Sequence, residues 1–206
     1  MSREKYVNIP LEKMEAGRAE SHEAVMGLVD RMRKGDREAL MAIIRLYQKK
    51  VFLLAYSYFR NSEDAMDIVQ ETFLRLYQKA GQFQKGRNFQ NWLLQIAKNL
   101  CIDTHRKHHK RSGDLRRVKS LEDLNSPLGE SDDCQDASDI RHIFAECLKR
   151  LSEKQRMVFT MKHYNDLEYR EIAMILKIST GTAKSLHFKA VQNLRALMTP
   201  HLEGKS

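Results

Sequence analysis

Apolar residues recur at three- and four-residue steps along most of the chain, which is the spacing of an amphipathic helix. Three such stripes fall in the first half, within residues 40–58, 65–76 and 92–101. Gly35-Asp36 precedes the first stripe. Asn61, followed by Glu63 and Asp64, precedes the second and has the composition of a capped helix start. The pattern predicts an all-α domain over residues 23–112, preceded by an N-terminal extension, 1–22.

The composition changes in the middle of the chain. Residues 122–139 contain seven acidic residues and no Lys or Arg, and Pro127 and Gly129 lie among them. Because this stretch has few large apolar side chains to bury, we expect residues 113–139 to form a flexible acidic linker.

Helical spacing returns in the last part of the chain. Ser152 with Gln155 three residues later is a capping-box pattern. Two short helices, 168–176 and 180–197, are predicted on either side of Lys177-Ile178-Ser179. This arrangement is typical of a helix-turn-helix and ends a second small helical domain, 140–200, before a tail, 201–206. From the pattern alone, an ordinary helical hairpin with solvated lysines is the alternative.

The net charge of +9 over 206 residues favours a polyanionic partner, most commonly nucleic acid. The first 21 residues lack the apolar core of a signal peptide, and the longest uncharged apolar run, Val51 to Phe59, is too short to cross a bilayer. The three cysteines form no CxxC pair. We therefore expect a reduced, cytoplasmic protein that does not insert into membranes.

Motifs in both halves resemble one protein family. Asp64–Tyr77 reads DAMDIVQETFLRLY, Phe89–Lys107 reads FQNWLLQIAKNLCIDTHRK, and Leu151–Arg156 reads LSEKQR before the helix-turn-helix. In this order, over residues 25–198, they resemble the two conserved domains of bacterial sigma factors. The domains that larger sigma factors add are missing, which implies the extracytoplasmic-function (ECF) group.

The resemblance implies a subunit that binds core RNA polymerase and directs promoter-specific initiation, in a stress or envelope-signal response controlled by an anti-sigma factor. Domain 23–112 corresponds to sigma region 2, which docks on the clamp of the largest subunit and recognises and melts the −10 element. Domain 140–200 corresponds to region 4, which reads the −35 element and meets the flap of the second subunit. An acidic rim around an exposed leucine suits a protein contact, because DNA phosphates repel acids. The predicted clamp contacts are Asp67, Gln70, Glu71 and Leu74.

Two further sets of residues are predicted to contact promoter DNA. Aromatic and basic side chains that alternate along a loop and helix suit unpaired DNA, since rings stack on bases while cations follow phosphates. The predicted −10 contacts are Phe83, Lys85, Arg87, Lys98, Asn99, Arg106, Lys107 and Lys110. We assign Trp92 to packing. The outer face of the last helix supplies the predicted −35 contacts, Thr182, Lys184, Ser185, Phe188 and Lys189. Leu186 and His187 stand where the family usually has a basic and then an aliphatic residue.

Other kinds of function leave weaker marks on the sequence. Cys101, His105 and His109 recur on one helical face and are possible zinc ligands, but a fourth ligand is not evident. We predict no metal, no cofactor and no enzymatic activity, because no catalytic motif is present. The alternatives are a stand-alone helix-turn-helix repressor and a metal-dependent nuclease that uses the histidine cluster.

Overall fold

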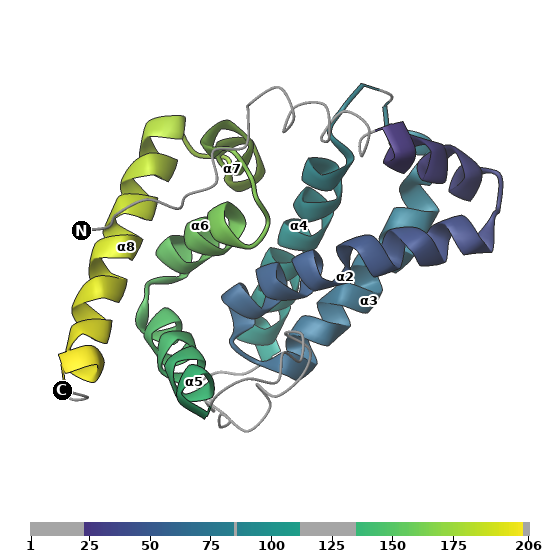
Figure 1. The fold of residues 1–206 in the computed structure, drawn as a ribbon. Helices are drawn as coiled ribbons and strands as arrows, with labels where there is room; N and C mark the ends of the chain where they lie inside the picture. Colours follow the sequence, from purple (N-terminus) through teal and green to yellow (C-terminus); the bar gives the residue numbers. More distant parts are fainter. Residues whose placement is uncertain (1–22, 85, 112–134, 204–206) are drawn as a thin grey trace, which may run out of the picture.

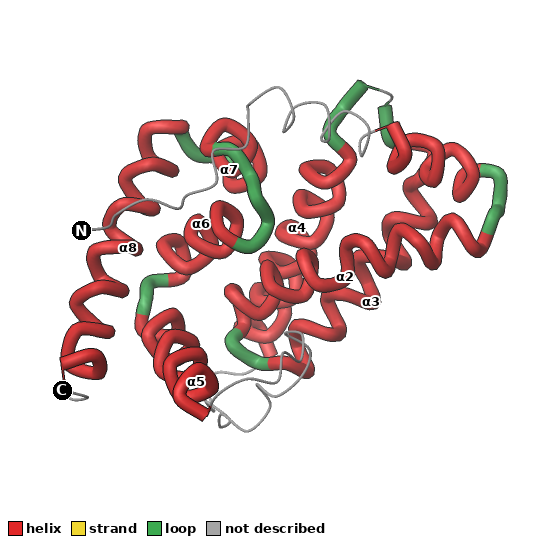
Figure 2. Tube along the Cα trace, in the orientation of Figure 1, coloured by secondary structure: helices red, strands yellow, loops and turns green. Residues whose placement is uncertain are grey.

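The computed structural model describes residues 23–84, 86–111 and 135–203, and helices make up all its regular secondary structure there (Figures 1 and 2). The first helix covers 23–33. It is followed by α2 (Arg37–Phe59), α3 (Ser62–Lys79), the 3-10 turn η1 (Ala80–Gln82), α4 (Phe89–Arg111), α5 (Gln135–Arg150), α6 (Glu153–His163), α7 (Tyr169–Leu176) and α8 (Thr180–Glu203). The predicted all-α class is confirmed. The N-terminal extension 1–22, Lys85 and linker residues 113–134 lie outside the described residues.

The second helical part begins earlier than predicted. The linker was expected to continue to residue 139, but α5 begins at Gln135. The acids Asp136 and Asp139 lie in the first turns of α5, where the positive end of the helix dipole favours negative charge. The acidic composition of this short stretch therefore does not prevent helix formation.

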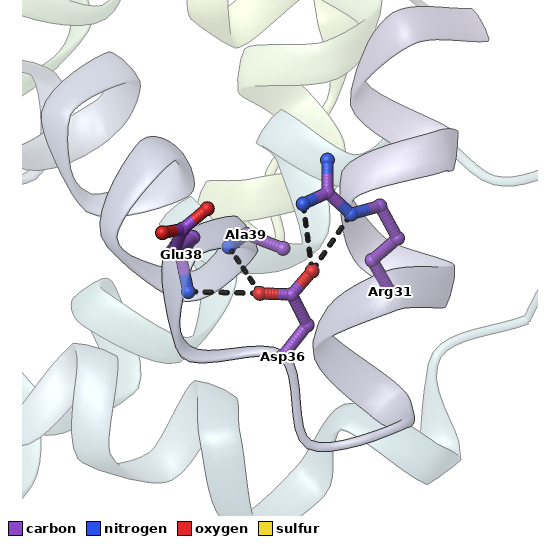
Figure 3. A network of polar contacts seen from close by, with 4 residues as sticks. All are labelled: Arg31, Asp36, Glu38 and Ala39. Carbon is purple, nitrogen blue, oxygen red and sulfur yellow. Dashed lines mark hydrogen bonds and ion pairs between the residues drawn. The ribbon is translucent and has the colours of Figure 1, made fainter.

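Asp36 fixes the corner between the first helix and α2 (Figure 3). Its Oδ1 accepts hydrogen bonds from the backbone N–H groups of Glu38 (2.9 Å) and Ala39 (3.2 Å), while Oδ2 pairs with Arg31 Nη2 (2.7 Å). The Ala39 N–H, followed by the Arg31 guanidinium, holds the pKa of the Asp36 carboxyl below its ordinary value. Gly35 before it has a φ of +88°, a left-handed conformation that favours glycine.

Helices α2, α3 and α4 pack on one another and form the first bundle. Asn61 begins α3 as predicted: its side chain accepts hydrogen bonds from the N–H groups of Glu63 (2.8 Å) and Asp64 (3.2 Å). The predicted apolar stripes face inward, and Leu54, Leu76, Leu93 and Ala97 are among their fully buried members.

The last four helices form a second bundle, in which α5, α6 and α7 all contact α8. Ser152 caps α6 through the N–H of Gln155 (3.4 Å). In the turn between α7 and α8, Lys177 is left-handed (φ 55°) and the Ile178 N–H donates to the Ala173 carbonyl oxygen (3.0 Å). Ser179 Oγ accepts from the N–H of Thr182 (3.0 Å) and so caps the start of α8.

The two bundles touch each other directly. Helix α2 contacts α6 and α4 contacts α7, and Figure 1 shows α6 and α7 between α8 and the first bundle. A single apolar cluster includes Leu94 and Ala97 of α4 together with Met161 of α6 and Ile172 of α7. The sequence pattern predicts two helical domains, and the structure adds that they share this buried cluster.

Candidate nucleic-acid interface

The predicted −35 face of α8 is open to solvent. Thr182, Lys184, Ser185, Phe188 and Lys189 are all exposed. Phe188 is 62% exposed, which is unusual for a large apolar side chain. The opposite side of α8 is buried, with Ala183, Ala190 and Leu194 packed against the other helices. The residues predicted for this face are therefore brought together on one side of a helix whose other side is fixed.

Leu186 and His187 occupy the inner part of α8. Leu186 is half-buried against the shared apolar cluster. The His187 ring lies near three rings from α6 and α7: its Nε2 is 2.8 Å from Nε2 of His163, its Nδ1 is 3.0 Å from the Tyr169 hydroxyl, and it stacks at 6.1 Å from Phe159. Both departures from the family pattern thus pack inward and are not part of the exposed face of α8.

The outer face of α3 carries the residues predicted to bind polymerase. Asp67 and Gln70 are exposed and Leu74 is 53% exposed, while Glu71 pairs with Arg75 Nε at 2.8 Å. Two more apolar side chains, Met66 (47% exposed) and Tyr77 (50%), lie on the same arc of the helix. Neither residue is among the predicted contacts, although their spacing from Gln70 and Leu74 places them on this face.

The stacking role predicted for Phe83 is wrong. Phe83 is only 3% exposed, and its ring lies 5.5 Å from that of Phe89 and 5.1 Å from that of Trp92. Arg33 holds this segment by donating hydrogen bonds to the carbonyl oxygens of Ala80 (2.7 Å) and Phe83. These rings fill the space between the first helix and α4, so the loop uses its aromatics for packing. Trp92 packs as predicted.

The polar and basic residues predicted to meet the −10 element divide into an exposed group and a buried one. Arg87, Asn99, Arg106 and Lys107 are exposed. Lys98, however, is 7% exposed and its Nζ donates to Asn99 Oδ1 (3.3 Å). Burial, followed by repulsion from Lys177, lowers the pKa of Lys98. A residue that we predicted to face DNA is therefore buried in this structure. Lys85 and the side chain of Lys110 lie outside the part of the chain that the structure describes.

Two of the possible zinc ligands on α4, Cys101 and His105, pack against other parts of the fold. The Cys101 thiol is fully buried, and burial raises its pKa to about 12, whereas a zinc ligand must be a thiolate. The His105 ring packs edge-on against Tyr58 at 5.6 Å. His109 has no described side chain. Within the described residues, no three His, Cys, Asp or Glu side chains gather in a way that could hold a metal ion.

No helix in the described ranges combines the length and the hydropathy that crossing a membrane requires.

Comparisons with known proteins identify both bundles. Residues 43–111 match the Sigma-70 region 2 family, and residues 141–194 match the Sigma-70, region 4 family. The ECF RNA polymerase sigma factor SigW of Bacillus subtilis is 28% identical over 173 residues, which cover 81% of this chain and 92% of SigW. The ECF RNA polymerase sigma-E factor of Escherichia coli K12 is 30% identical over 169 residues, covering 79% and 88% respectively.

Solved structures have the same fold. The sigma factor RpoE of Bartonella quintana, solved with the anti-sigma factor NepR, aligns with a TM-score of 0.65 at 24% identity, covering 77% of this chain and 96% of RpoE. CnrH, solved with the cytosolic domain of CnrY, aligns with a TM-score of 0.61 at 21% identity, covering 84% and 96%. With region 2 and region 4 present in this order and a 30% identical relative covered over most of its length, the chain belongs to the ECF sigma factors, the subunits that direct bacterial RNA polymerase to promoters.

Proposed function

We propose that the exposed face of α8 reads the −35 element in the major groove. The supporting observation is that its polar side chains and Phe188 face solvent while the other side of α8 is packed. Lys184 and Ser185 lie near the amino end of α8 and are suited to base edges. Lys189, farther along the helix, is suited to a phosphate, and Phe188 to a thymine methyl group or a sugar. Thr182 lies in the first turn, where the helix dipole favours an anion.

Domain 23–112 is proposed to read the −10 element. The residues proposed to contact the DNA are Arg87, Asn99, Arg106 and Lys107. Their exposure and charge support an unpaired strand running along α4. Lys85 and Lys110 remain proposed contacts, and so does Lys98, although it is buried in this structure. Phe83 is excluded because it is buried.

Core polymerase binds through both domains. The outer face of α3, with Asp67, Gln70, Glu71 and Leu74, is proposed to dock on the clamp of the largest subunit. Met66 and Tyr77 extend this surface with apolar area, which is the composition expected at the centre of a protein interface. Domain 140–200 meets the flap of the second subunit.

Control by an anti-sigma factor is the remaining part of the proposal. RpoE and CnrH, whose folds this chain shares, were solved with NepR and with the cytosolic domain of CnrY, respectively. The chain acts in the cytoplasm and performs no catalysis of its own, since RNA synthesis is the chemistry of the polymerase.

Purified chain added to core polymerase and genomic DNA, followed by mapping of transcript starts, tests this proposal. Starts that share one pair of −35 and −10 sequences, and that require both chain and core, are the expected result. Footprints on a palindrome without core polymerase would instead indicate a repressor. DNA cleavage that stops on addition of a chelator would indicate a nuclease.

A further inference from the structure

Arg33, at the end of the first helix, ties that helix to the segment that joins α3 to α4. Its Nε donates a hydrogen bond to the Ala80 carbonyl oxygen (2.7 Å), and its Nη2 donates one to the Phe83 carbonyl oxygen. These acceptors lie 47 and 50 residues further along the chain. Nη1 lies 3.6 Å from Oδ1 of Asp30 in the same helix. Each nitrogen of the guanidinium therefore has a partner, and two of the partners belong to the distant segment.

The two carbonyl groups stand at the beginning and just after the end of η1 (Ala80–Gln82). Carbonyl groups at a helix end lack a donor within the helix and form the negative end of its dipole, so a cation is well placed there. A guanidinium suits this position because two of its N–H groups lie parallel along one edge and can reach two oxygens at once. A lysine ammonium group has no such edge. Arg33 thus fixes the path of the chain on both sides of η1.

Beyond this anchor the chain makes a short turn toward α4. The Arg87 N–H donates to the Gln84 carbonyl oxygen (3.3 Å), and Gly86 has a φ of +91°, a left-handed conformation that favours glycine. Asn88 ends the turn, because its Oδ1 accepts from the Asn91 N–H (3.1 Å) at the start of α4. Gln84, Arg87 and Asn88 are exposed. The turn is therefore held at its two ends, and the position of Arg87 depends on both.

The first helix has other contacts that keep it in place. Val29 (2% exposed) and Met32 (1%) belong to the apolar cluster that also contains Phe83 and Phe89. Burial of large apolar side chains stabilises more than the net contribution of a few half-buried hydrogen bonds. We therefore expect substitution of Arg33 to leave the fold intact while it releases the two carbonyl groups.

We propose that Arg33 is a positioning residue for promoter recognition: by holding the carbonyl oxygens of Ala80 and Phe83, it fixes the turn that presents Arg87 to the −10 element. This inference rests on the proposed assignment of Arg87 to −10 DNA. A cation distinguishes bases only when it is held in a defined geometry, whereas its attraction to phosphates does not depend on sequence. Release of the turn should therefore reduce the preference among bases.

Arg33→Met and Arg33→Lys test this role in the full chain combined with core polymerase. Arg33→Met keeps an apolar stem without a donor, and Arg33→Lys keeps the charge but can reach only one of the two oxygens. Templates that differ at single −10 positions compete in one transcription reaction, and the ratio of their transcripts measures the base preference. Templates that differ in the −35 element are compared in the same way. Lys34→Met removes a charge from the adjacent exposed position and is the matched control.

We expect Arg33→Met to lower the preference among −10 templates by about tenfold at the position that Arg87 reads, and Arg33→Lys to lower it less. The −35 preference and the circular dichroism spectrum should not change in either variant. Lys34→Met should behave like the unmodified chain. If Arg33→Met does not fold, Arg33→Lys decides the question, because it keeps both the stem and the charge.

Arg87→Ala, alone and combined with Arg33→Met, separates this inference from the assignment on which it rests. Because Arg33 acts through Arg87, the double variant should show the same −10 preference as Arg87→Ala alone. If Arg87→Ala leaves the preference unchanged, the proposed −10 contact fails, and the inference fails with it. If Arg87→Ala lowers the preference while folded Arg33 variants keep it, or weaken all −10 templates alike, only the positioning role is overturned. Additive losses in the double variant also overturn it.

Discussion

The Nε2 atoms of His163 and His187 lie 2.8 Å apart, so one ring must carry the proton that the other accepts. The Tyr169 hydroxyl lies 3.0 Å from Nδ1 of His187, so this group of rings connects α6, α7 and α8. Burial lowers the pKa of both imidazoles. Repulsion from Lys162 lowers the pKa of His163 further, and repulsion from His163 and then Lys162 lowers the pKa of His187 further. Lys162 itself stacks over the Tyr169 ring at 5.1 Å.

Acid should weaken the helix-turn-helix through this pair. Because the pKa of each histidine is lower in the folded chain than in the unfolded one, the unfolded chain binds more protons in the window below the unfolded value of about 6.5. The contribution of the pair is full above that value and is lost as pH falls toward the folded pKa. We therefore expect the temperature at the midpoint of thermal unfolding to decrease as the pH is lowered from about 7.5 to about 5.5.

His187→Leu supplies the aliphatic residue that the family usually has here, and it should flatten this pH dependence. His201→Gln, at an exposed position in the last turn of α8, is the matched control and should keep it. An unchanged pH dependence in a folded His187→Leu variant would show that the acid sensitivity has another source.

Reversal of charge at Asp67 should weaken the complex with core polymerase. Asp67→Lys changes an exposed side chain on the outer face of α3, so circular dichroism should not change. Affinity, measured by titration of labelled chain with core polymerase, should fall because a cation replaces an acid in the proposed clamp contact. Glu38→Lys, an exposed acid at the start of α2, is the control. Equal affinities for the two variants would remove α3 from the interface.

Local features of the fold were accessible from sequence because they depend on neighbours along the chain. The spacing of Leu54, Leu76 and Leu93 with other apolar residues predicted which helix faces are buried. Caps such as Asn61 predicted where helices begin. The exposed face of α8 followed from the same periodicity.

Contacts between distant segments were not accessible in this way. Lys98 looks like a solvent-facing cation on α4, and nothing near it in the sequence indicates that it is buried in the folded chain. Phe83 follows polar residues in a loop, a pattern that fits a stacking platform as well as a core side chain. The sequence does not indicate that Phe83 packs on Trp92, or that Arg33, about 50 residues earlier, anchors the loop by hydrogen bonds.

Arg156 should contribute measurably to stability. Its guanidinium is buried, and burial followed by repulsion from Arg60 lowers its pKa to about 10. The guanidinium donates hydrogen bonds to the carbonyl oxygens of Ser57 in α2 and Leu151. Arg156→Met keeps much of the side-chain volume but leaves both oxygens without this donor. We expect the free energy of unfolding, measured with urea, to fall by ~1–3 kcal/mol. Arg150→Met, at an exposed site in the same bundle, should change it far less. Equal losses in the two variants would mean that the Arg156 hydrogen bonds do not stabilise the fold.

Lys184 and Lys189 should respond differently to substitution, because they lie at different distances from the amino end of α8. Both are exposed on the proposed −35 face. Lys184 is near the end that enters the major groove, so Lys184→Ala should cost ~1–3 kcal/mol of binding and relax the preference at one base. Lys189 is placed for a phosphate, so Lys189→Ala should weaken all sequences alike and lower the salt slope by about one.

Binding of the full chain to −35 duplexes that differ at single base pairs, measured at two salt concentrations, distinguishes these outcomes. The −35 face is exposed in this structure, so the free chain is a valid sample. Arg195→Ala, an exposed basic residue farther along α8, controls for the loss of one charge from the helix. If Lys184→Ala leaves both affinity and base preference unchanged, α8 enters the groove on another face. The inward packing of Leu186 and His187 fixes the present orientation of α8. A different face could therefore enter the groove only if this packing changed when DNA binds.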